Sequence, residues 1–153
     1  MKKYIGFRMI QAEGADRSKE DKRVFLNSDA RPSDQEYEEG YTDGYQSWLP
    51  KDIFEKAYMQ VGENNTITQD MVDNFIVSYE IVTQQNKITI VTATLANNFT
   101  IVESSACVDP ANYNEQIGTD ICIDRIKNKI WFLLGFLLQT AKDGVGNSFA
   151  RIT

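Results

Sequence analysis

Residues 75–106 read FIVSYEIVT, QQN, KITIVTATL, ANN and FTIVESSA in succession. The three longer segments are rich in Ile, Val and Thr, which are enriched in β-strands. The two short polar segments between them have the composition of tight turns. The stretch therefore predicts three antiparallel strands over 75–83, 87–95 and 99–106, connected as a meander.

The last of these strands alternates between two different faces. Phe99, Ile101, Glu103 and Ser105 share one face, and their neighbours share the other, because side chains alternate along a strand. The sheet is therefore only half apolar at this end, which indicates an edge that is exposed or covered by a partner.

From Asn112 onward the apolar residues recur at spacings of three and four, which predicts a long C-terminal helix. Asn112 or Asn114 is expected to cap its start, and Asp143-Gly144 to end it. A helix of about 28 residues is about 42 Å long, which exceeds what a three-stranded sheet covers. Either the helix breaks near Gly118, or its free part packs on another subunit.

The apolar surface of this helix is wider than one stripe, because Trp131, Phe132, Gly135 and Phe136 extend it. A surface this wide favours a homo-oligomer formed through the C-terminal helix. The alternative is a single domain whose helix is covered on both sides internally.

The whole chain is expected to be α+β, with a small unit over 1–62 and a second domain over 63–153. The smaller unit combines a strand over 4–12, a long polar loop over 14–40, a hairpin at Asp43-Gly44 and a helix from Pro50. A turn-rich linker, 62–65, follows. Thr66 and Gln69 then resemble a capping box for a short helix through Phe75.

The composition excludes several kinds of chemistry. The chain has 153 residues, a formal net charge of −6 and no histidine. It therefore has no Ser-His-Asp or Cys-His nucleophile and no imidazole metal ligand, and we expect neither an enzyme nor a metal or other cofactor. A glycosidase or nuclease built only from Asp and Glu stays open.

Nucleic acid and membrane are also disfavoured as partners. The net negative charge repels phosphate backbones, and no basic stripe interleaved with aromatic residues is present. The longest apolar run, 130–138, is too short to cross a bilayer. Cys107 and Cys122 lie in apolar neighbourhoods and are expected to be small core residues in a reducing compartment.

Several segments resemble one known family. They are LANNFT at 95–100, ESSACVDPANYN at 103–114, Ile117-Gly118, and the helix with KIW at 129–131 and LGFLL at 134–138. Together they resemble the gp-forty-nine-like, gene-sixty-six family of tailed-phage and prophage proteins over about residues 66–141. Two positions depart from the family pattern: Asn98 stands at a usual turn glycine, and Leu134 at a commonly acidic position. The resemblance implies phage origin and an accessory, non-virion role, and it implies no known enzyme.

A candidate ligand-binding site follows if the helix folds back along the sheet. Arg125 and Lys129 are one helical turn apart and suit a phosphate. Phe99 or Tyr113 would stack on a base, and Asn112 would orient it. The alternative is that both cations belong to the solvated side of an amphipathic helix. A second aromatic group, Tyr41, Tyr45 and Trp48, fits a core role for Trp48 better than a ligand platform.

These observations give a leading hypothesis and two alternatives. The first is a phage anti-defence protein of the host bacterial cytoplasm, a homo-oligomer that sequesters a small nucleotide signalling molecule without catalysis. The second is a protein–protein inhibitor or assembly module that uses the 131–136 surface and the acidic segment 34–39. An acidic mimic of DNA is the third, although no ordered rows of carboxylates support it.

Overall fold

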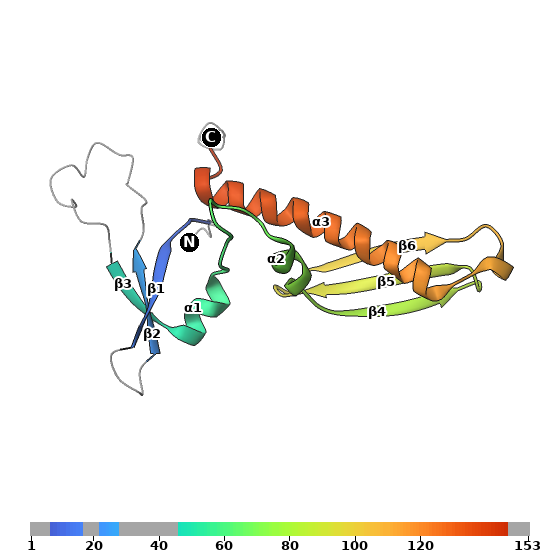
Figure 1. Cartoon of the computed structure of the whole chain (residues 1–153), viewed down its shortest axis with the longest axis horizontal. Helices are drawn as coiled ribbons and strands as arrows, with labels where there is room; N and C mark the ends of the chain where they lie inside the picture. The colour runs from blue at the N-terminus through green and yellow to red at the C-terminus, as the bar shows by residue number, and fades with distance from the viewer. Residues whose placement is uncertain (1–6, 17–21, 28–45, 147–153) are drawn as a thin grey trace, which may run out of the picture. The chain divides into compact units, whose positions relative to one another are not determined.

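The computed structural model of the chain describes residues 7–16, 22–27 and 46–146 (Figure 1). The fold is α+β, as predicted, and the described residues form two compact units. Unit 1 belongs to Met1–Gln60 and Leu137–Thr153, and unit 2 is Val61–Phe136. A division into independent domains at 62/63 stays a prediction.

Unit 2 contains the predicted meander. Strands β4 (Ile76–Gln84), β5 (Ile88–Leu95) and β6 (Thr100–Ala106) form an antiparallel sheet in the order β4-β5-β6. The predicted boundaries are confirmed to within one residue. The strands form here because they are rich in β-branched residues, and their side chains alternate between the two faces, so that one set can be covered.

The two turns of the meander depend on residues with positive φ. Gln85 and Asn86 both have φ 52°, the sign pattern of a type I′ turn, and the Lys87 N–H donates to the Gln84 carbonyl at 3.1 Å. Asn98 has φ 64° in the second turn. Asparagine suits this turn, since Asn also reaches positive φ.

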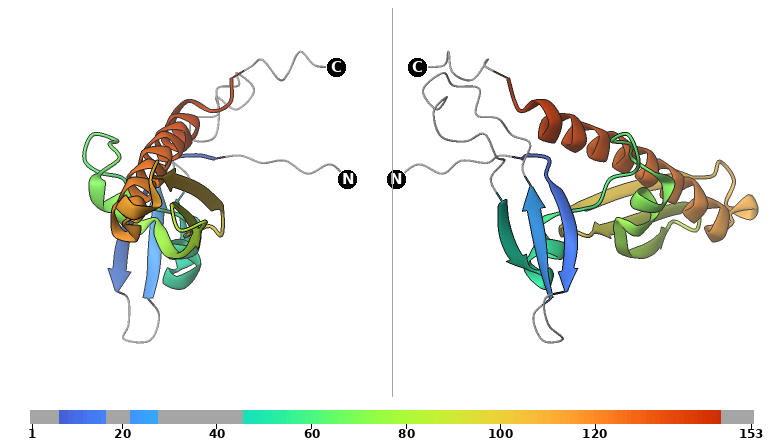
Figure 2. Two further views of the ribbon diagram at one scale, coloured as in Figure 1. Left: turned by 90° about the vertical axis from the view of Figure 1, so that its right-hand side faces the viewer. Right: turned by 60° about the vertical axis from the view of Figure 1, so that its left-hand side comes forward.

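A single long helix, α3 (Glu115–Asp143), covers one face of this sheet (Figure 2). The alternate residues of β5 that face the helix are buried, whereas the intervening ones are only partly buried. The helix has 29 residues and no break at Gly118, so the first of the two expected arrangements is wrong. Its buried apolar residues join those of the sheet in one core of Val72, Val91, Ala93, Leu95, Ile101, Cys122, Ile126, Ile130 and Leu134.

The short helix α2 (Gln69–Asn74) has its N-cap two residues later than predicted. Thr68, and not Thr66, is the N-cap, and its hydroxyl accepts from the Met71 N–H at 3.3 Å. Thr66 instead bonds back to Gly62 through its backbone and closes a tight turn. The expected linker 62–65 is therefore part of this turn.

Unit 1 differs more from expectation. Strands β1 (Gln11–Asp16), β2 (Lys22–Asn27) and β3 (Gln46–Pro50) form a second antiparallel sheet, followed by α1 (Lys51–Ala57). The helix after Pro50 is confirmed.

Three details of the predicted small unit change. Residues 7–10 are not a strand, so the described part of the predicted strand 4–12 contains strand only at 11–12. The predicted loop 14–40 is wrong where it overlaps β1 and β2. Strand β2 was not predicted because charged residues lie beside the short apolar segment of 22–27. The Asp43-Gly44 turn and the acidic segment 34–39 lie outside the described residues, as do Tyr41 and Tyr45.

Candidate functional site

Two capping side chains lie in the segment that leads into α3. Asp109 Oδ1 accepts from the Ala111 N–H at 2.9 Å and opens a short 3-10 helix, η1 (Pro110–Asn112). Asn114 Oδ1 accepts from the Ile117 N–H at 3.1 Å, so Asn114 caps α3. The candidate residue Asn112 is exposed in η1. Tyr113 lies between the two caps.

Tyr113 is held against the sheet by its hydroxyl group. Its oxygen lies 2.7 Å from Thr83 Oγ1 and 2.9 Å from Thr89 Oγ1. Thr83 also donates to Glu115 Oε2 at 2.5 Å. An ionised carboxylate only accepts and each hydroxyl donates one proton, so the bonds run from Thr89 through Tyr113 and Thr83 to Glu115. Tyr113 thus anchors the start of α3 to two strands.

A glycine sets the distance between α3 and β5 just beyond this anchor. A β-carbon at Gly118 would lie 2.8 Å from the Thr89 Cβ, closer than real β-carbon contacts. Glycine therefore lets the helix backbone approach the strand. The Cys122 thiol, one turn further, is buried, and burial raises its pKa. Cys122 is a core residue, as expected.

Cys107 differs from this expectation, because it is only half-buried and its thiol donates to the Asp109 carbonyl at 3.2 Å. Both cysteines are free.

Arg125 and Lys129 lie side by side over β6, as their spacing predicted. Arg125 Nη1 donates to the Ser104 carbonyl at 2.7 Å, and the Lys129 ammonium forms an ion pair with Glu103. The Lys129 side chain is 55% exposed. The pair is therefore fixed on one side by β6 and open to solvent on the other.

The five candidate residues do not lie together at one site within a single chain. Phe99 lies in the turn before β6 and is 56% exposed, whereas Asn112 and Tyr113 follow the other end of that strand. A strand of this length spans about 20 Å. The structure brings Arg125 and Lys129 together, and it separates Phe99 from Tyr113.

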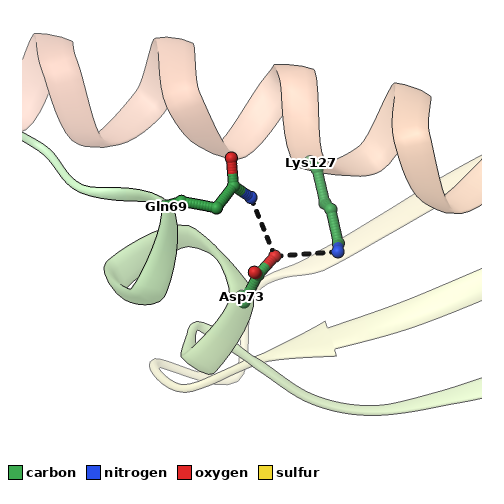
Figure 3. Close-up of polar contacts among 3 residues, drawn as sticks. All are labelled: Gln69, Asp73 and Lys127. Carbon is green, nitrogen blue, oxygen red and sulfur yellow. Dashed lines mark hydrogen bonds and ion pairs between the residues drawn. The ribbon is translucent and has the colours of Figure 1, made fainter.

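An ion pair between α2 and α3 was not predicted from the sequence (Figure 3). Lys127 Nζ lies 2.8 Å from Asp73 Oδ1, and Gln69 Nε2 donates to the same oxygen at 3.0 Å. The Lys127 bond, followed by that from Gln69, lowers the pKa of Asp73. The four-residue spacing of Gln69 and Asp73 was a signal for their bond, but only the fold brings Lys127 to them.

The described part of the chain also bears on metal binding and on membrane spanning. No group of three or more Cys, Asp or Glu residues there is placed to hold a metal ion. None of the helices in the described ranges combines the length and apolar character that a membrane span requires.

Unit 2 thus belongs to the class of α+β proteins in which one helix covers a three-stranded meander. Residues 67–142 match the model of the Phage protein (N4 Gp49/phage Sf6 gene 66) family. The resemblance inferred from the sequence is confirmed, and it spans α2, the whole meander, η1 and nearly all of α3. Searches of curated proteins and of solved structures found no match to the chain.

Proposed function

We propose that this chain is a phage accessory protein that works by binding and not by catalysis. Its proposed ligand is a small nucleotide-type immune signal of the host, which it sequesters in the bacterial cytoplasm as a homo-oligomer. The family match supports the phage context. The absence of histidine from the sequence favours capture over conversion.

The observation that carries this proposal is the pair of neighbouring cations over β6. Arg125 is oriented by the Ser104 carbonyl, which uses one of its five N–H donors and leaves others for a phosphate. Lys129 lies one turn away and exchanges its contact with Glu103 for the ligand. Arg125 is oriented before binding, which lowers the ordering cost of its contact with the ligand.

The aromatic part of such a site comes from more than one chain in this proposal. Phe99 is exposed at the far end of β6, and the Tyr113 hydroxyl is engaged by two threonines. A stacked base therefore requires that an oligomer bring Phe99 or Tyr113 of one copy toward Arg125 of another. Capture of the ligand therefore depends on assembly of the oligomer.

Calorimetric titration tests the proposal with a panel of cyclic dinucleotides, cyclic trinucleotides and cyclic ADP-ribose variants. We expect one class to bind, and the Arg125→Gln and Lys129→Gln variants to lose at least about tenfold in affinity. Lys142→Gln, a change of an exposed cation in the last turn of α3, is the matched control. No binding by any ligand of the panel would refute capture of these signals.

A second candidate function is inhibition or assembly of a protein partner through α3. The observation that favours it is a set of exposed apolar side chains on this helix. Phe132 is 74% exposed and Ile117 is 59% exposed. Exposed apolar surface of this kind is typical of protein interfaces. The homo-oligomer proposed through the C-terminal helix would use the same side chains.

A photo-crosslinking residue at position 132 tests this second candidate in phage-infected cells. We expect one defined crosslinked species, either to a second copy or to a host or phage protein. The same crosslinker at Asp124, an exposed and charged position of α3, is the control. Equal, diffuse crosslinking at both positions would contradict a specific partner on this surface.

A further inference from the structure

The two edges of the β4-β5-β6 sheet differ in how their backbone groups are satisfied. In the β5–β6 ladder the odd-numbered residues face each other with hydrogen bonds, as the flanking bonds Leu95 N–H to Phe99 O and Cys107 N–H to Lys87 O show. The even-numbered residues of β6 therefore point their N–H and C=O groups outward. Ser104 is one of them, and Arg125 donates to its carbonyl.

Charged side chains thus lie along part of the β6 edge. Arg125 bonds the outward carbonyl, and the Lys129–Glu103 ion pair lies beside it. Charged groups at an edge are a common means by which proteins block further strand pairing.

The outward backbone groups of the β4 edge differ from those of β6. Even-numbered residues of β4 face β5, so the odd-numbered residues of β4 point their backbone groups away from the sheet. Within the described part of the chain, no backbone hydrogen bond reaches those outward groups. The strand has nine residues, one charge and no proline, and three of its side chains, Tyr79, Ile81 and Val82, are 51%, 40% and 51% exposed.

We propose that β4 pairs antiparallel with β4 of a second copy, giving a two-fold dimer with a continuous six-stranded sheet. The sequence of β4 selects the register. Pairing centred on Glu80 would place two carboxylates opposite each other, which is destabilising. Pairing centred on Ile81 places Ile81 against Ile81 of the second copy and Glu80 against Val82, with no like charges opposed.

The covered β6 edge explains why assembly at this sheet stops at two copies. A sheet with two open edges continues to grow, whereas one open edge gives a closed, isologous pair. The dimer leaves Arg125 and the outer surface of α3 accessible. It stands independently of the proposed ligand and of any contact between copies through the C-terminal helix.

Light scattering after size exclusion, with the full chain over a range of concentrations, tests the proposal. We expect a dimer for the wild type. Ile81→Lys and Ile81→Glu each place two like charges at the two-fold axis, so each should raise the dimer dissociation constant about tenfold or more. An equimolar mixture of the two variants should restore the dimer, because opposite charges then face each other.

Val102→Lys is the matched control, since Val102 is 54% exposed on the covered edge strand β6. It should leave the dimer unchanged, and far-ultraviolet circular dichroism checks that every variant folds. A wild type that stays monomeric overturns the proposal. So does a dimer that survives Ile81→Lys, or one that Phe132→Ser dissociates while Ile81→Lys does not. Nucleotide titration reports on the proposed function separately.

Discussion

The inner and outer surfaces of α3 both carry large apolar side chains, but they differ in what they contact. On the inner surface, every fourth residue from Gly118 to Leu134 is buried against the sheet. On the outer surface, Ile117 and Phe132 are 59% and 74% exposed. Apolar content alone therefore does not decide which side of this helix is buried.

The two glycines of α3 show the difference most directly. Gly118 lies where a β-carbon would meet Thr89, whereas a β-carbon at Gly135 would have nothing within 4 Å. The inner surface lies close to β5 because Gly118 has no side chain that would contact the strand. Close fit to the sheet, more than hydrophobicity, therefore defines the inner surface.

The largest expected effect is loss of a buried isoleucine from the inner surface. Ile126 is fully buried, so Ile126→Ala should lower the free energy of unfolding by about 2–5 kcal/mol through lost burial and a cavity. Ile117→Ala makes the same chemical change on the outer surface and should stay within about 0.5 kcal/mol of wild type. Urea unfolding measures both, and equal losses would erase the distinction between the surfaces.

Substitution of alanine for each of these two glycines should change the free energy of unfolding in opposite directions. Gly118→Ala should destabilise by about 1–3 kcal/mol, because the Thr89 Cβ is fixed to its backbone and cannot move aside. Gly135→Ala should stabilise by about 0.5–1 kcal/mol, since alanine is the better helix former and meets no neighbour. Thermal unfolding followed by circular dichroism compares them. A stabilised Gly118→Ala variant would show that the helix does not depend on this close approach.

A smaller effect should follow from removal of the Tyr113 hydroxyl group. Tyr113→Phe deletes the bonds to Thr83 and Thr89 and should cost about 1 kcal/mol. In a double-mutant cycle with Thr83→Val, the two changes should be non-additive because they break the same bond. Additive losses would mean that the hydroxyl chain does not couple the start of α3 to β4.

The smallest effect concerns the ion pair beside the inner surface, between Asp73 and Lys127. The folded state lowers the pKa of Asp73, chiefly through the Lys127 bond, so its stabilisation is present above the ordinary carboxyl pKa. It is lost as the pH falls through the lowered folded-state value. Asp73→Asn should therefore reduce stability near pH 7, and the difference should shrink as the pH falls below the ordinary carboxyl pKa. The exposed Asp124→Asn is the control, and a difference that grows on acidification would reverse the assigned sign.

The meander and the helix could be read from the chain because each has a strong local period. Asn98 could also be placed in a turn, since its neighbours and its tolerance of positive φ are local properties. The first sheet was missed in part because β2 is short and flanked by charges. The cap of α2 was misplaced because Thr66 and Thr68 are equivalent by composition, and only the backbone turn at Gly62 separates them.

The candidate site was predictable only where one helix turn sets the geometry. Arg125 and Lys129 are neighbours because helical residues four apart lie on one side. Phe99 and Tyr113 were expected to join them, but an extended strand lies between these two residues and separates them.

By itself the sequence determined the strands, the long helix, the family resemblance and the absence of histidine chemistry, since these depend on residue types and short-range periods. Tertiary structure alone decided which side of α3 is buried, that Arg125 bonds the β6 edge, and that no backbone group of the described residues pairs with the outer edge of β4. These outcomes depend on which backbone groups and side chains meet across the sheet, and such distances are set by packing and not by spacing along the chain.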